Sequence, residues 1–204
     1  VFLATSWRMP PPLTQSVSNL FYAGKLQAAA ANSANQVEWS GQAQGLLFEP
    51  VHHSGNSTAS EEEVERIAAL VDQLYGQPYQ RAKLVNGEMT TVRGELGQYD
   101  ILITAPYNMQ VNRLQKCIGH KARIGTVDKF QGQEAPVAIH SLTASDGDSA
   151  PRGLDFLLDP NRLNVAISRA QCLSIVVGSP GLASGVANTV AEAEQINRLC
   201  TLMN

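Results

Sequence analysis

Three short segments of the chain combine residue types that could bind phosphate groups. The first, residues 126–134 (TVDKFQGQE), carries two acids, a cation, two amides and a glycine directly after an apolar run. Thr126 could hydrogen-bond a phosphate of a strand lying over a sheet, Glu134 could accept hydrogen bonds from ribose hydroxyls, and Gly132 permits close backbone approach. Taken singly, each residue fits a polar loop whose side chains face solvent better than it fits a binding site.

The second segment, residues 161–171 (NRLNVAISRAQ), predicts a helix that carries two arginines. Arg162 and Arg169 lie seven residues apart, so two helical turns would place them on one face, with Asn164 beside them. An arginine that reaches a γ-phosphate stabilises the charge that develops during phosphoryl transfer, an effect of about 10³–10⁵ in rate. The alternative is a helix with two surface arginines.

In the third segment, residues 101–110 (ILITAPYNMQ), an apolar run leads into Pro106 and Tyr107 before a helix opens. An aromatic side chain at such a position can support a stacked base. It can also simply pack against its neighbours, which is the more frequent outcome.

The elements that must position these segments alternate along the chain. Short, almost entirely apolar runs predict strands, and residues with helical spacing predict the helices between them. The predicted strands are residues 45–51, 100–105, 123–127, 136–142 and 173–178, and the predicted helices are residues 60–75, 108–118, 161–170 and 183–203. This alternation predicts an α/β domain with a central, mainly parallel sheet. Ligands of such sheets sit beyond the carboxyl ends of the strands, where we expect all three segments.

The helix that begins after Ser60 has the clearest local signals. Ser60 and Glu63 form a capping box, and Gly76 is a suitable stop. Residues 28–44 and 77–98 show no strong periodicity, and we expect flexible loops or excursions there.

Composition narrows the function classes. The 204 residues suit a single domain, and the 44% hydrophobic fraction suits a globular core without an apolar run long enough to span a bilayer. The three cysteines lack metal-like spacing and suit the reducing cytoplasm, and the adjacent His52 and His53 are expected to face solvent, so no metal site is predicted. The net charge of −3 does not indicate nucleic-acid binding, but residues 113–129 are locally basic, as a groove that follows a phosphate backbone requires.

Taken together, the segments resemble the later motifs of superfamily 1 helicases. The resemblance is to the branch typified by the nonsense-mediated-decay helicase and the replication helicase–nuclease. APYNxQ is similar to motif IV, GTVDKFQGQE to motif V and NRLNVAISRA to motif VI, and residues 6–26 are similar to the RMHP segment of that branch. The sequences of motifs V and VI most resemble those of bacterial helicases fused behind a RecB-like nuclease domain. Residues 1–204 are therefore expected to form one RecA-like domain, the second (C-terminal) motor domain of a larger, cytoplasmic protein.

The resemblance implies roles for individual residues. Arg8 and Arg169 would contact the γ-phosphate of ATP, with Arg162 as a helper, and these three are the candidate catalytic residues. The candidate nucleotide-binding residues are Trp7, Gln131, Gly132 and Glu134, and the candidate nucleic-acid-binding residues are Pro106, Tyr107, Thr126, Lys129 and Asn164. Pro10 departs from the family, which has histidine at that position.

The chain lacks the residues that cradle the phosphates of ATP. No GxxxxGK[ST] motif and no Asp-Glu pair occur in the sequence. We therefore expect ATP and Mg²⁺ to bind between this domain and an N-terminal RecA-like domain of the same protein, and single-stranded nucleic acid, with DNA favoured, to lie across both. We expect the isolated domain to be inactive. Two alternatives remain, a nucleic-acid-binding module without motor activity and half of a nucleotide-dependent switch.

Overall fold

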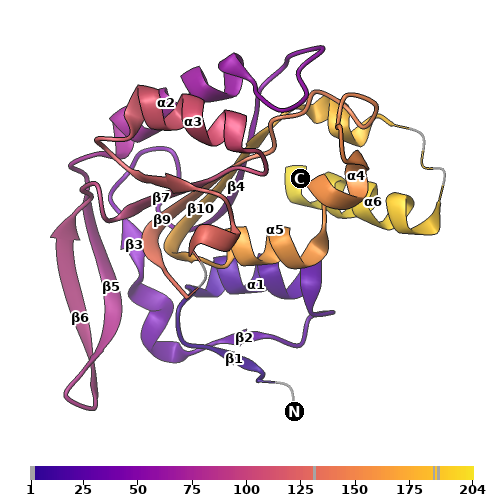
Figure 1. Cartoon of the computed structure of the whole chain (residues 1–204). Helices are drawn as coiled ribbons and strands as arrows, with labels where there is room; N and C mark the ends of the chain where they lie inside the picture. The colour runs from indigo at the N-terminus through magenta and orange to yellow at the C-terminus, as the bar shows by residue number, and fades with distance from the viewer. Residues whose placement is uncertain (1–2, 131, 186, 188) are drawn as a thin grey trace.

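The structure, a computed structural model, describes residues 3–130, 132–185, 187 and 189–204. Within these residues the centre is a five-stranded parallel sheet with the strand order β4-β10-β9-β7-β8 (Figure 1). The strands are β4 (Gly45–Pro50), β7 (Ile101–Thr104), β8 (Arg123–Gly125), β9 (Ala135–Ser141) and β10 (Ala170–Gly178). Each overlaps a predicted strand, which confirms the predicted α/β fold with a central parallel sheet.

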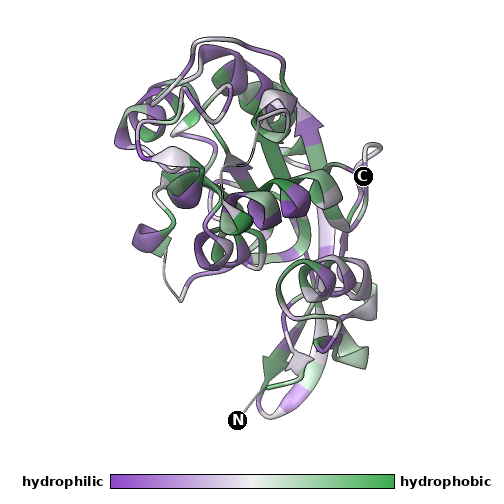
Figure 2. Cartoon of the chain, turned by 90° about the vertical axis from the view of Figure 1, so that its right-hand side faces the viewer, coloured by the Kyte–Doolittle hydropathy of each residue, from purple (hydrophilic) through white to green (hydrophobic). Residues whose placement is uncertain are grey.

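Helices cover both faces of the sheet and make three layers. One face is covered by α2 (Glu61–Leu74) and α3 (Asn108–Ile118), and the other by α1 (Pro11–Phe21), α5 (Pro160–Ile167) and α6 (Val190–Met203) (Figure 1). Each interface has its own apolar core, the first with Ile67 and Leu114 and the second with Leu13 and Leu163. The strands are hydrophobic because both faces are covered, and the helices are mixed in hydropathy (Figure 2).

The start of α2 confirms Ser60 as the N-cap but not the reciprocal half of the predicted capping box, because the backbone N–H of Ser60 donates to Gln110 and the Glu63 carboxylate binds other residues. The Ser60 side chain accepts a hydrogen bond from the backbone N–H of Glu63 at 3.2 Å, as an N-cap serine should. Acidic residues fill the first helical turn, where they favour the positive end of the helix dipole. The chain leaves the helix through Gly76, whose φ of 82° is readily adopted by glycine.

Residues 77–98 lie outside the central sheet, as predicted for an excursion. They form two strands that the sequence analysis did not assign. The strands β5 (Pro78–Val85) and β6 (Glu88–Glu95) pair antiparallel over their full length. Asn86 and Gly87 connect them with φ values of 51° and 86°, the pattern of a type I′ turn. We call this element the β5–β6 hairpin. It extends away from the sheet on the same side as the N-terminal segment (Figure 1).

The N-terminal segment and residues 28–44 contain only short elements. A two-stranded parallel sheet joins β1 (Thr5–Ser6) to β2 (Gln27–Ala28). The 3-10 helix η1 (Ala30–Ala34) then leads to β3 (Gln36–Val37), which pairs antiparallel with β5 and attaches the β5–β6 hairpin to the domain.

One helix was not predicted, and the boundaries of two others differ from those predicted. The short helix α4 (Gly153–Leu157) was not predicted, and α6 begins at Val190, after the 3-10 helix η3 (Pro180–Ala183), and not at residue 183. The helix predicted over residues 161–170 ends at Ile167, because the chain is already part of β10 from Ala170 onward. In the part of the chain that the structure describes, no helix has the length and apolar character needed to cross a membrane.

His140 is a buried titratable group in the middle of the sheet. Its ring is 4% exposed, and Nδ1 lies 2.8 Å from the hydroxyl oxygen of Thr104 on the neighbouring strand. Burial lowers the pKa of His140 from 6.5 to about 4. A backbone hydrogen bond with Thr104 only partly offsets this effect, and the positive charge of Arg162 adds to it.

We predict that His140 makes the domain less stable in mild acid. The unfolded chain binds a proton at His140 below pH about 6.5 and the folded chain only near pH 4, so this contribution to the free energy of unfolding is complete above pH 6.5 and declines as the pH falls toward 4. The full decline is on the order of 3 kcal/mol. Urea unfolding between pH 4 and 7 would measure it. His140→Gln should flatten the curve relative to wild type, and an unchanged slope would contradict the assignment.

Candidate functional site

Arg8, Glu134 and Gln171 form one hydrogen-bonded group although they lie far apart in the sequence. The Nε of Arg8 lies 2.6 Å from one carboxylate oxygen of Glu134, and the side-chain amide of Gln171 donates to the other at 2.7 Å. Arg8 also donates through Nη1 to the backbone carbonyl of Ser168 at 2.9 Å. The N-terminal segment is thereby docked on the residues that precede β9 and β10.

Arg169 lies next to this group and has unused hydrogen-bonding capacity. Arg169 is 9% exposed, and its Nη1 donates to the carbonyl of Gln133 at 3.3 Å. Its Nε is buried and has no acceptor among the described residues. Burial lowers the pKa of Arg169, the positive charge of Arg8 lowers it further, and the carboxylate of Glu134 acts in the opposite direction. Two guanidinium groups thus share the field of one carboxylate, an arrangement that favours a bound anion.

These residues lie at the amino ends of their strands. Glu134 directly precedes β9 and Arg169 directly precedes β10, and Ala135 pairs with Ala170 in the register between them. The prediction that all three segments meet at the carboxyl ends is therefore wrong for Glu134 and Arg169. Segment 126–134 begins at the carboxyl end of β8 and crosses to the opposite edge, which the sequence pattern alone did not reveal.

Arg162 and Arg169 do not share a helical face, contrary to the prediction, because α5 ends between them. Both nevertheless line the same cavity, of about 260 Å³. Arg162 is held there by Asp128, whose carboxylate lies 2.7 Å from Nη2, and by the ring of Phe156, whose centroid is 4.6 Å from the guanidinium carbon.

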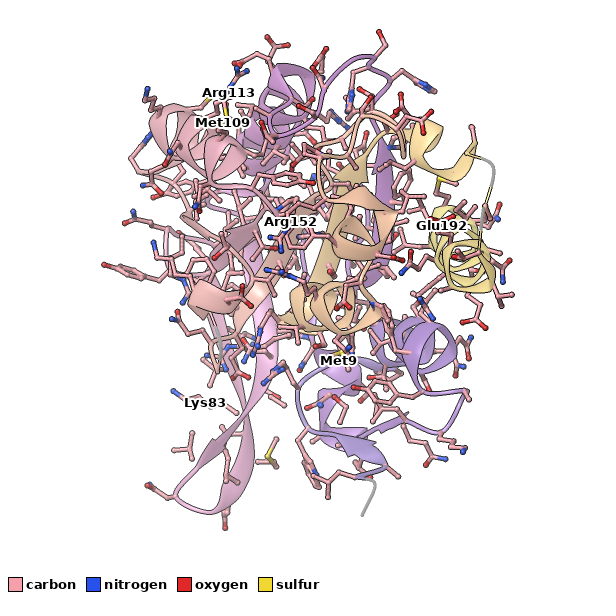
Figure 3. The ribbon with its side chains drawn as sticks, turned by 45° about the vertical axis from the view of Figure 1, so that its right-hand side comes forward. Met9, Lys83, Met109, Arg113, Arg152 and Glu192 are labelled. Atoms are coloured by element: carbon pink, nitrogen blue, oxygen red, sulfur yellow. The ribbon has the colours of Figure 1, made fainter. Side chains whose placement is uncertain are left out.

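A larger cavity, of about 630 Å³, adjoins the group formed by Arg8, Glu134 and Gln171, which line part of its wall. The indole of Trp7 also lines it and is 66% exposed. The remaining lining residues come from the β5–β6 hairpin and are Arg81, Ala82, Lys83, Leu84, Gly87 and Met89. Figure 3 shows Lys83 on this hairpin, which extends beside the N-terminal segment that carries Met9. The sequence analysis assigned no role to the hairpin or to Gln171.

Gly132, a candidate nucleotide-binding residue, has a left-handed backbone conformation. Gly132 has a φ of 78°, and a Cβ added there would meet nothing within 4 Å, so its conformation, and not a tight contact, explains the glycine. Gln131 lies outside the described residues.

The candidate nucleic-acid-binding residues divide into exposed and buried side chains. Thr126 and Pro106 follow the carboxyl ends of β8 and β7 and are half-buried, and Lys129 is exposed beside them. The ring of Tyr107 is 9% exposed and packs against Phe156 at a centroid distance of 5.7 Å. Burial raises the pKa of Tyr107. The structure therefore places the Tyr107 ring in the core, which is the alternative that the sequence left open.

Asn164 lies on α5 and faces α1. Its side-chain amide donates to the hydroxyl of Tyr22 at 2.7 Å, so in this conformation it links two helices.

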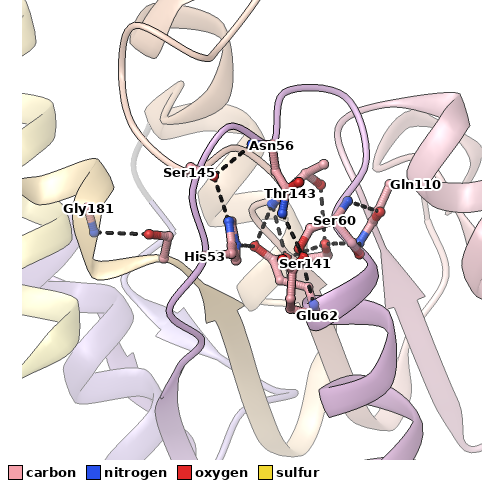
Figure 4. Close-up of polar contacts among 11 residues, drawn as sticks. His53, Asn56, Ser60, Glu62, Gln110, Ser141, Thr143, Ser145 and Gly181 are labelled. Atoms are coloured by element: carbon pink, nitrogen blue, oxygen red, sulfur yellow. Dashed lines mark hydrogen bonds and ion pairs between the residues drawn. The ribbon is translucent and has the colours of Figure 1, made fainter.

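A buried polar network occupies the carboxyl edge of the sheet and was not predicted (Figure 4). The carboxylate of Glu63, which is fully buried, accepts hydrogen bonds from Ser141 Oγ at 2.6 Å and from the backbone N–H of Thr143, and it lies 3.1 Å from His53 Nε2. Ser145 Oγ lies 2.7 Å from the other ring nitrogen of His53. Thr143 has a φ of 73°, which is strained for a β-branched residue, and Glu63 holds it there. His53, expected to face solvent, is a structural residue.

The locally basic segment is partly neutralised by acidic residues at both ends of α2. Arg113 lies 2.7 Å from Glu61, and Lys121 lies 2.6 Å from Asp72, because α3 packs beside α2. These pairs are exposed and stabilise little, but they reduce the positive charge available to a phosphate backbone. No group of three His, Cys, Asp or Glu residues suited to a metal ion occurs among the described residues.

Comparison with known proteins gives one family and a consistent set of relatives. The sequence model of the AAA domain family AAA_12 matches residues 1–181. The chain is 30% identical over 189 residues to the ATP-dependent helicase upf1 of Schizosaccharomyces pombe, which covers 87% of this chain and 19% of the relative. It is 26% identical to the regulator of nonsense transcripts 1 homolog of Neurospora crassa, covering 87% of the chain and 16% of the relative. It is 28% identical to the probable helicase MAGATAMA 3 of Arabidopsis thaliana, and this match covers 97% of the chain and 25% of the relative. The chain thus spans a quarter or less of the length of these relatives.

We predict a weak, salt-sensitive coupling between Arg8 and Glu134. Both side chains are partly exposed, at 32% and 44%, so their interaction should contribute no more than about 1 kcal/mol to the free energy of unfolding. A double-mutant cycle with Arg8→Ala and Glu134→Ala, measured by urea unfolding, should give this coupling at low salt and less at 0.5 M salt. Zero coupling at both salt concentrations would mean that Arg8 does not dock on Glu134 in solution.

Proposed function

The chain belongs to the AAA domain family AAA_12, and from this premise we propose that it is the second motor domain of an ATP-dependent nucleic-acid helicase. In this proposal the chain supplies one wall of the ATP site, including an arginine finger, and part of the track for a single strand. The first motor domain of the same protein would supply the P-loop, which this sequence lacks.

The observation that carries the proposal is the convergence of Arg8, Glu134 and Arg169. A carboxylate flanked by two guanidinium groups suits a ligand that presents both hydroxyls and phosphates, as a nucleoside triphosphate does. A protein that only binds a nucleic-acid backbone has no need for a ribose-binding carboxylate next to a buried arginine.

Each residue has a defined part in the proposed reaction. Glu134 accepts hydrogen bonds from the ribose, while Trp7 offers its exposed ring to the base. Arg8 and Arg169 contact the γ-phosphate and stabilise the charge that develops on it, with Arg162 as a helper. Because these contacts form only when the two motor domains close on ATP, hydrolysis would reopen the cleft and move the domains along the strand.

The residues described here do not suit Mg²⁺, which prefers carboxylate and water ligands beside the phosphates. Asp128 is paired with Arg162, and Glu134 is paired with Arg8 and Gln171. The Mg²⁺ that accompanies ATP would therefore be held by residues of the first motor domain.

For the nucleic acid we propose single-stranded DNA, bound where Thr126, Pro106 and Lys129 follow the carboxyl ends of β7 and β8. The similarity of motifs V and VI to bacterial helicases with a RecB-like nuclease domain supports DNA and a nuclease domain upstream. The names of several relatives refer to transcripts, which supports RNA instead. The proposed location is the cytoplasm.

We predict that Arg169→Ala abolishes strand-stimulated ATP hydrolysis. The measurement is the steady-state rate of the protein that carries both motor domains, with and without single-stranded DNA. Loss of the finger should lower kcat by at least about 10²-fold, because Arg8 alone would leave part of the charge that develops on the γ-phosphate without a partner. Arg66→Ala is the matched control, since Arg66 lies on α2, away from the site, and is paired with Glu49 on β4.

The outcomes separate the alternatives. If strand-stimulated hydrolysis persists in Arg169→Ala, the helicase assignment stands but the assignment of Arg169 to the ATP site is wrong. A wild-type protein that binds single strands without hydrolysing ATP would instead support a binding module, and ATP hydrolysis that no strand stimulates would support a nucleotide-dependent switch.

We also predict that single-stranded DNA binds more tightly than RNA of the same sequence. Competition between labelled DNA and unlabelled RNA at fixed salt would measure the ratio, because affinities at different salt concentrations are not comparable. Lys129→Ala should weaken both to a similar extent, since a lysine that contacts phosphate does not distinguish the sugars. A preference for RNA would overturn the choice of DNA and leave the motor assignment intact.

A further inference from the structure

The β5–β6 hairpin and the N-terminal segment together enclose the larger cavity, and this arrangement points to a second wall of the nucleotide site. The two strands of the hairpin pair over their full length, and β3 pairs with β5 and attaches the hairpin to the domain. Its tip extends beyond the sheet (Figure 1). Leu84 and Met89 line the cavity that Trp7 and Glu134 also line. The cavity volume of about 630 Å³ lies in the range of sites for small organic ligands.

One buried amide fixes the hairpin relative to the proposed ribose and phosphate ligands. The side chain of Asn35, 1% exposed, donates to the backbone carbonyls of Arg8 at 3.1 Å and of Gln171 at 2.9 Å. Its carbonyl oxygen accepts from the backbone N–H of Ala82, on the hairpin, at 2.7 Å. At the base of the hairpin the hydroxyl of Tyr79 donates to Asp100 at 3.1 Å. The hairpin is therefore held in register with the site.

The hairpin contributes exposed apolar side chains to the wall of the cavity. Leu84 is 64% exposed and Met89 is 38% exposed, and both line the cavity together with the exposed indole of Trp7. Apolar side chains exposed in this way around a concave site favour a flat, apolar occupant such as a nucleobase.

Arg81 supplies an unsatisfied donor in the same cavity. Its Nε is buried and has no acceptor among the residues that the structure describes. A buried N–H without a partner is costly, so a ligand that provides an acceptor would be favoured. Arg81, Lys83 and Arg8 outnumber Glu134 among the charged residues of the described cavity wall, which favours an anionic ligand.

We propose that the β5–β6 hairpin closes over the base and ribose of the bound nucleoside triphosphate. Leu84 and Met89 cover the base that stacks on Trp7, and Arg81 donates to a ribose or phosphate oxygen. This inference rests on the proposed function, because it assumes that Glu134 and Arg8 bind the same nucleotide. Since the hairpin offers the base apolar contact and no base-reading side chain, it increases affinity for the nucleotide without acting on the γ-phosphate.

The test compares ATP with inorganic tripolyphosphate, which has the phosphates but neither base nor ribose. In the protein that carries both motor domains, Leu84→Ser/Met89→Ser should weaken ATP binding about tenfold by calorimetry and raise the KM for ATP similarly, with kcat little changed. The affinity for tripolyphosphate should not change. Arg81→Gln should weaken ATP binding in the same way.

Two controls are available on the same hairpin. Val85→Ser removes an exposed apolar residue of the tip and Arg93→Gln removes a charge of β6, and neither residue lines the cavity. Both should leave the KM unchanged, and circular dichroism would confirm that all variants are folded.

The outcomes distinguish the hairpin from the proposed function. Suppose that Arg169→Ala abolishes hydrolysis while the double variant Leu84→Ser/Met89→Ser (the tip variant) leaves the affinity and the KM for ATP unchanged. The hairpin proposal is then wrong and the motor assignment stands. Equal losses for ATP and tripolyphosphate in the tip variant would also overturn it, because they would indicate a general effect on domain closure. If the wild type does not bind ATP at all, both proposals fail.

Discussion

The pairing of β9 with β10 determines where the charged residues of the site lie. Ala135 pairs with Ala170, and the N–H of Ala135 donates to the carbonyl of Arg169 at 3.1 Å. Glu134 and Arg169 directly precede these two fully buried strands, so the pairing of the strands holds their backbones close together. A slip of one residue in this register would turn the buried side chains of β10 to the opposite face. The geometry of the proposed ATP site is therefore maintained by the same hydrophobic burial that stabilises the sheet.

The N-terminal segment depends on this junction as well. Arg8 reaches Glu134 and the carbonyl of Ser168, and Asn35 binds the backbone of Arg8 and of Gln171. Because Asn35 also accepts from the β5–β6 hairpin, three segments that are distant in sequence converge on one buried amide. Removing such a group would leave buried polar atoms without partners, so its structural role is large for its size.

Sequence patterns were sufficient for the sheet and for the cap of α2, because these depend on local signals: apolar runs, Ser60 and Glu63. They were insufficient for the position of Arg169, since helical spacing continues through NRLNVAISRA while pairing with β9 already requires a strand at Ala170. The hairpin was missed although Asn86-Gly87 is a strong turn signal, because its flanking strands are polar and exposed. The buried role of His53 depends on Glu63 and Ser145, and the distance between His53 and Ser145 in sequence hides that contact.

The ion pair between Arg8 and Glu134 has a further consequence for how the site would work. In the structure Glu134 is the partner of Arg8. Burial lowers the pKa of Arg169, and the positive charge of Arg8 lowers it further. In the proposed ATP site, a nucleoside triphosphate would offer hydroxyls to Glu134 and negatively charged oxygen atoms to both arginines, so it would replace this ion pair by contacts that satisfy all three side chains. The ion pair is partly exposed and weak, so its loss would cost little. Because the γ-phosphate is the group that separates ATP from ADP, under the proposed function this exchange would make the docking of the N-terminal segment depend on which nucleotide is bound.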